Sequence, residues 1–156
     1  MVVLKRAALI DGALILSLLV LGLIGYKLSP LLLPTAEMTV APSAGCDLNQ
    51  GACAANVPGG GRLQFALEPR PVAPVVPLQA SVALEGLSAE RVTLDFSGVD
   101  MNMGLNRTTL VWAGDRHAGT VTLPVCVTGR MAWRATVIVE SGRQRIAVPF
   151  TFEVGQ

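Results

Sequence analysis

Seven short runs of alternating or β-branched residues follow one another between residues 62 and 154. Turn-forming residues separate the runs at intervals of about 8 to 15 residues, and no helical periodicity lies between them. Such a pattern is typical of short strands that pair with their neighbours, so it predicts an all-β domain. The runs are RLQFALE, LQASVALEG, RVTLDFSG, RTTLVWAG, HAGTVTLPV, MAWRATVIVESG and RQRIAVPFTFEV.

Two further segments add to this prediction. The sequence ESGRQ at 140–144 is typical of the tip of a hairpin. The sequence EPRPVAPVVP at 68–77 carries four prolines, which a central strand cannot accommodate, so it suits an edge or a crossing between strands. The expected fold over residues 62–156 is therefore an immunoglobulin-like antiparallel β-sandwich.

An uncharged hydrophobic stretch at residues 12–26 precedes this domain. Its 15 residues would span about 22 Å as a helix, which is less than the roughly 30 Å of a bilayer core. We therefore expect a transmembrane helix extended to 8–28. Lys5 and Arg6 precede it while few positive charges follow closely, so the N-terminus is expected in the cytoplasm.

A cleaved signal sequence is the alternative, because APSAGC at 41–46 resembles the small residues before a lipidated cysteine. The hydrophobic stretch ends well upstream of Cys46, which favours an uncleaved anchor. The segment after the anchor is rich in Ala, Pro, Ser, Gly and Asn, so we expect a tether with little regular structure. The expected layout is a cytoplasmic N-terminus at 1–7, the transmembrane helix at 8–28, an extracytoplasmic tether at 29–61 and the β-sandwich at 62–156.

Composition narrows the classes of function. With 156 residues and a formal net charge of +1, the chain has room for one compact domain and carries no basic patch for nucleic acid. A single histidine, without G-x-S-x-G, H-E-x-x-H or phosphate-loop motifs, gives enzyme chemistry little support. We therefore expect a protein that is not an enzyme.

The segment DMNMG sets two thioethers two positions apart, beside an acid and before a glycine. In an extended backbone Met101 and Met103 project to the same face. Cu(I) is a soft ion that prefers thioether and thiolate ligands. Together with Cys126, His117 and Met131, which lie on neighbouring expected strands, the two methionines form a candidate copper site. The alternative is that the methionines are adaptable core fillers.

Three cysteines follow the hydrophobic stretch. Cys46 and Cys53 close a ring of eight residues, and a disulfide there would contribute roughly 2 to 3 kcal/mol of stability. The same pair could instead cycle between dithiol and disulfide, or hold Cu(I). Cys126 remains unassigned. It could be a small buried hydrophobic residue, form a disulfide with Cys46 or Cys53, or be a ligand in a thiolate site that His117 would complete.

Two segments carry a family resemblance, VDMNMGLNRTTL and HAGTVTLPVCVTGRMAWRATV. Their order resembles the pattern of the FixH/YtkA-like domain family, which has a Met-rich turn followed by Gly, an LP strand end and a Gly-x-x-x-Trp-type strand. The likeness covers residues 62–154 and the N-terminal anchor. It implies an immunoglobulin-like extracytoplasmic domain on one membrane helix, linked to copper handling or to maturation of haem-copper oxidases.

The resemblance also implies a function and a place in the cell. It suggests a membrane-anchored periplasmic copper-binding or copper-delivery factor for assembly of a respiratory haem-copper oxidase, with Cu(I) as the bound ion. The expected partners are the bacterial inner membrane, which the chain crosses once, and the oxidase or its copper-assembly factors. The alternative is an interaction module that docks on a membrane complex and uses its sulfurs only for packing and a disulfide.

Overall fold

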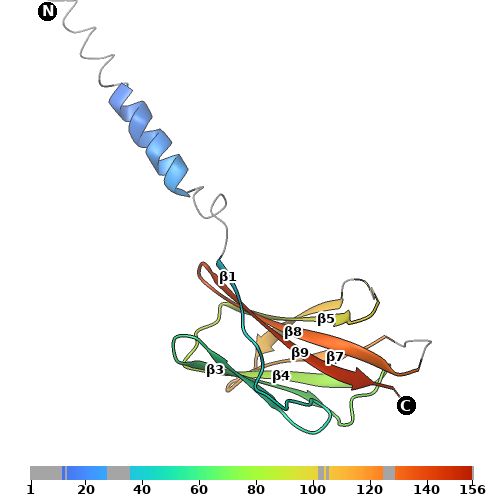
Figure 1. The fold of residues 1–156 in the computed structure, drawn as a ribbon. Coiled ribbons are helices and arrows are strands. Elements are labelled where there is room, and N and C mark those ends of the chain that lie inside the picture. The colour runs from blue at the N-terminus through green and yellow to red at the C-terminus, as the bar shows by residue number, and fades with distance from the viewer. Residues whose placement is uncertain are drawn as a thin grey trace, which may run out of the picture. The chain divides into compact units, whose positions relative to one another are not determined.

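A computed structural model of the chain divides it into two compact units, Met1–Thr35 and Ala36–Gln156. The first unit contains a helix over residues 14–27, with exposed side chains (Figure 1). In the part of the chain that the structure describes, no helix combines the length and the apolar character needed to cross a bilayer. Of the expected span at 8–28, residues 8–11, 13 and 28 lie outside the described part. The described residues are 12, 14–27, 36–101, 104, 106–124 and 129–155.

The second unit is built of short strands, and the seven expected runs coincide with the last seven of them, β3 to β9. This confirms the prediction of an all-β domain. The hairpin tip at 140–144 is also confirmed, because Ser141 pairs with Gln144 across a two-residue turn. The proline-rich segment connects β3 to β4. The described strands are β1 (Ala36–Thr39), β2 (Cys53–Val57), β3 (Gly61–Glu68), β4 (Pro77–Glu85), β5 (Arg91–Gly98), β6 (Asn106–Trp112), β7 (His117–Thr122), β8 (Met131–Ser141) and β9 (Gln144–Val154).

These strands form one curled sheet in the order β1-β9-β8-β5-β6-β7-β4-β3-β2 (Figure 1). Neighbouring strands are antiparallel except β1, which runs parallel to β9. β6 joins the two halves of the sheet, because residues 106–110 pair with β5 while Val111 and Trp112 pair with β7. The halves face each other, since the rings of Phe65 on β3 and Phe150 on β9 lie 5.3 Å apart between centroids.

The core fills the space between the two halves. Leu63, Phe65 and Leu67 of β3 are fully buried, and the residues between them turn outward, as the two-residue period of a strand requires. Trp133 of β8 is buried in the same core. Each large apolar side chain buried in this way stabilises the fold by about 1.5 to 3 kcal/mol.

The folded unit begins at Ala36, not at Arg62 as the composition indicated. Residues 36–61 supply β1 and β2, and the core includes Val40 and Leu48 from this segment. The expectation of a tether with little regular structure is therefore wrong for these residues. β2 escaped recognition because its sequence, CAANV, alternates buried and more exposed positions without a large side chain to mark the pattern.

A disulfide joins Cys46 and Cys53, whose Cα atoms lie 5.4 Å apart. The loop that it closes is part of the fold, because Leu48 within it is fully buried. The side-chain oxygen of Asn49 accepts a hydrogen bond from the backbone N–H of Val72 at 2.9 Å, which fixes the loop to the β3–β4 connection. The disulfide therefore braces a segment that contributes to the core.

Replacing both cysteines, Cys46→Ala with Cys53→Ala, should lower the free energy of unfolding by about 2.5 kcal/mol, because an eight-residue ring no longer restricts the unfolded chain. Urea denaturation of the full chain in detergent, with and without reductant, measures the effect. Reductant should destabilise the wild type and leave the double variant unchanged. A wild-type midpoint that does not respond to reductant would contradict this role of the disulfide.

Candidate functional site

The strand register gives the second unit two ends that carry different candidate residues. At one end Gly98 of β5 pairs with Trp133, and Met131 at the start of β8 pairs with Val154. This end is named the methionine end, and it includes the β5–β6 and β7–β8 loops. His117, the first residue of β7, lies at the opposite end, which is named the histidine end and includes the β4–β5 loop and the β6–β7 and β8–β9 turns.

Met101 lies in the β5–β6 loop at the methionine end, and its side chain is 40% exposed. The backbone N–H of Val99 donates to the carbonyl of Ala132 at 2.9 Å, which holds the start of this loop against β8. Gly104 has a φ of 75°, a left-handed conformation that glycine adopts freely. Met103 lies outside the described residues. Met101 is therefore a partly exposed residue of this loop.

The β7–β8 loop, which carries Cys126, belongs to the same end. Cys126 lies outside the described residues, but both flanks of its segment are described. On one side, the carbonyl of Leu123 accepts a hydrogen bond from the backbone N–H of Val75 at 2.9 Å, and on the other side Gly129 leads into β8. The loop with Cys126 thus begins and ends at the methionine end.

Met131 is a core residue and not an exposed ligand. Its side chain is 5% exposed and belongs to the hydrophobic core together with Val154 and Trp133. The sequence analysis grouped Met131 with the metal ligands, but the alternation of β8 turns it inward, where a thioether packs among apolar neighbours. Met131 is therefore removed from the candidate site.

His117 does not lie with Met101. It begins β7, five residues from Thr122 at the other end of that strand, and an extended strand of this length covers about 17 Å. The expectation that His117 shares one ion with the methionines is therefore corrected. The physical reason is strand direction: β6 starts at the methionine end, and the residue that begins the following antiparallel strand lies at the opposite end.

The Cys46–Cys53 disulfide leaves neither sulfur as a thiolate, which is the form of cysteine that binds Cu(I). Cys53 belongs to the buried core, and Cys46 packs against it. Of the alternatives for this pair, the structure has the disulfide. Within the described residues, no cluster of three or more His, Cys, Asp and Glu side chains is placed to hold a metal ion.

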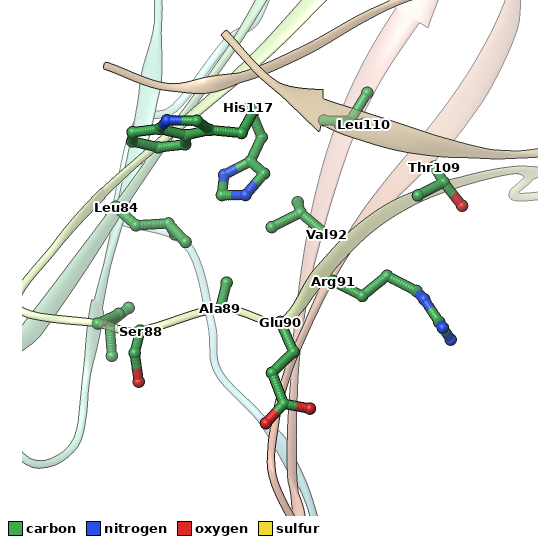
Figure 2. A pocket seen from close by; sticks show the side chains of 11 residues that line it. Leu84, Ser88, Ala89, Glu90, Arg91, Val92, Thr109, Leu110 and His117 are labelled. Atoms are coloured by element: carbon green, nitrogen blue, oxygen red, sulfur yellow. The ribbon is translucent and has the colours of Figure 1, made fainter. Parts of the chain in front are cut away.

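A pocket of about 580 Å³ opens at the histidine end. Figure 2 shows the imidazole of His117 among Leu84, Ala89 and Val92, while Glu90 extends away from it. Nδ1 of His117 is buried and has no hydrogen-bond partner among the described residues. Burial lowers the pKa of His117 below its ordinary value of 6.5, so the imidazole is neutral near pH 7.

Trp112 contributes to the wall of this pocket. Its indole meets the ring of His117 edge-on, with 5.0 Å between centroids, because the two residues pair across β6 and β7. The side chain of Trp112 is 58% exposed, whereas Trp133 is buried in the core. Trp112 is exposed because β6 pairs with β5 only as far as Leu110, and its last two residues pair only with β7.

The pairing of Trp112 with His117 has a signal in the sequence WAGDRH that strand alternation alone does not reveal. Four residues with a glycine separate the two aromatic rings, which is a usual length for a hairpin turn. In the structure the backbone N–H of Ala113 donates to the carbonyl of Arg116 at 2.8 Å and closes this turn. A hairpin at this position would have placed both rings side by side.

No protein-family model matches this sequence, and no curated protein matches it either. Among solved structures, an engineered protein, Northeast Structural Genomics Consortium target OR128, is similar with a TM-score of 0.40 and 18% sequence identity. The match covers 64% of this chain and 20% of that chain, so this chain spans about a fifth of the length of the engineered protein. Function is therefore inferred from the residues of this chain and their geometry.

The lowered pKa of His117 makes stability depend on pH. Between its folded and unfolded pKa values the unfolded chain binds more protons than the folded chain, so the free energy of unfolding falls as the pH drops below about 6.5. Between about pH 7.5 and about pH 5.5, the free energy of unfolding of His117→Gln should therefore fall less than that of the wild type. Urea denaturation of the full chain in detergent at both pH values measures the difference. Equal losses in wild type and variant would contradict the buried, neutral imidazole.

Proposed function

We propose that this chain is a membrane-anchored periplasmic protein that binds Cu(I) and delivers it during assembly of a respiratory haem-copper oxidase. The proposed ligands are Met101, Met103 and Cys126. The proposal includes an immunoglobulin-like sandwich for the folded unit, a single membrane span over 8–28 and membership in the FixH/YtkA-like family, to which the sequence bears its resemblance.

The observation that carries the proposal is that two loops with soft donors share the methionine end. Met101 is exposed on the β5–β6 loop, and the β7–β8 loop that contains Cys126 begins and ends at the same end of the sheet. Two thioethers and one thiolate are a donor set that Cu(I) favours over hard ions. This set needs neither His117 nor the sulfurs of the disulfide.

The arrangement of the folded unit supports a role in delivery. β1 starts at the histidine end, because Ala36 pairs with Gln144 beside the β8–β9 turn. The methionine end is therefore the end of the folded unit away from the start of β1. The uncharged residues 12–26, with Lys5 and Arg6 before them, support the anchor and its orientation.

Met101→Leu with Met103→Leu should weaken Cu(I) binding at least about tenfold, or about 1.4 kcal/mol, because the substitution removes both thioethers and keeps the side-chain volume. Competition against a chromophoric Cu(I) chelator under anaerobic conditions measures the affinity. Met38→Leu is the matched control, since Met38 is 44% exposed on β1. Its affinity for Cu(I) should equal that of the wild type.

An unchanged affinity in the double variant would show that the methionines do not bind copper. A second candidate function would then apply, in which the folded unit is an interaction module on a membrane complex. The exposed indole of Trp112 favours this candidate, because large exposed aromatic side chains often mark contact surfaces. Its signature would be loss of partner binding in Trp112→Ala and none in the methionine variant.

A further inference from the structure

We propose that the histidine end docks on the surface of the lipid bilayer, with Val111 and Trp112 entering the boundary between headgroups and acyl chains. This end lies opposite the methionine end, so docking leaves the copper ligands free. The proposal rests on the membrane anchor within the proposed function and is independent of copper binding.

Val111 and Trp112 form an apolar projection at the end of β6. Val111 is 71% exposed and Trp112 is 58% exposed, whereas the other tryptophan of the chain, Trp133, is buried in the core. The pocket under His117 adds Leu84 and other apolar residues beside Trp112, while Val111 projects to the opposite face of β6. Exposed large apolar side chains at the same end of the domain indicate a surface that meets another apolar phase.

The chemistry of Trp112 suits a bilayer interface. An indole has a broad apolar body and one N–H donor, so it is most stable where one side is apolar and the other is wet. Within the described residues its N–H donates no hydrogen bond, and its contact with His117 is through the rings. The donor is therefore free to bind a lipid carbonyl or phosphate oxygen.

The length of the chain before β1 identifies the occupant. Eight residues separate Lys27, the last residue of the described helix, from Ala36 at the start of β1. Even a fully extended chain of this length spans only about 30 Å. Because β1 starts at the histidine end, a bilayer that held the helix would lie within that length of the start of β1.

Charge at the histidine end indicates how the surface would bind. The positive charges of the arginines equal the negative charges of the carboxylates in number, so attraction to anionic lipid is not the driving force. The driving force is insertion of the apolar side chains. Docking should therefore occur on zwitterionic lipid as well as on anionic lipid. The charged residues are Arg62, Arg91, Arg116, Arg143 and Arg145 on one side and Glu37, Glu85, Glu90, Asp115 and Glu140 on the other.

Tryptophan fluorescence of the full chain, reconstituted in phosphatidylcholine vesicles, tests the proposal. Trp133→Phe leaves Trp112 as the sole tryptophan, and Trp112→Phe is the matched control that leaves the buried Trp133. Where Trp133→Phe disturbs the core, subtracting the emission of Trp112→Phe from that of the wild type isolates the signal of Trp112. Flotation of the vesicles measures anchoring separately.

The emission of Trp112 should shift to the blue in vesicles, lose intensity with brominated phosphatidylcholine and become less accessible to acrylamide. Adding phosphatidylglycerol should change none of this, and Trp133 should not respond to the brominated lipid. A chain that floats with the vesicles while Trp112 stays unquenched overturns the docking and leaves the anchor intact. Quenching that requires phosphatidylglycerol overturns it too, and a chain that does not float overturns both the anchor and the docking.

Discussion

The whole fold depends on the change of partner along β6. Its first residues bond to β5 and its last two bond to β7, so one continuous sheet turns its inner face onto itself. Only this turn brings Phe65 on β3 and Phe150 on β9 into contact, although their strands stand near opposite edges of the sheet. Without this turn the apolar inner face of the sheet would be exposed to water, which would strongly destabilise the domain.

The same constraint separates the two ends of the domain and their chemistry. Because the strands run between the ends, side chains on the loops of one end are kept apart from those of the other by the length of a strand. Met101 is exposed where β5 ends, and Val111 and Trp112 are exposed where β6 ends. The proposed copper chemistry and the proposed lipid contact thus use surfaces that do not compete.

Local pattern was enough to predict β3 to β9, because alternation within a strand is a property of neighbouring residues. It could not predict β1, whose Ala36 pairs with Gln144 far along the chain. For the candidate site, the pattern identified Met101 as a loop residue, but it did not show the direction in which each strand runs. His117 and Met131 were therefore grouped with Met101. In the structure His117 lies at the opposite end of the domain, and Met131 is buried in the core.

The parallel pairing of β1 with β9 has a mechanical consequence. β1 is the first strand after the segment that leads from the helix, and its four residue pairs with β9 lie side by side along one axis. A pull on Ala36 away from the domain acts along that axis and loads these pairs together in shear. An antiparallel hairpin pulled at its open end would instead peel apart pair by pair, so the parallel pairing is the geometry that better resists a force applied at Ala36.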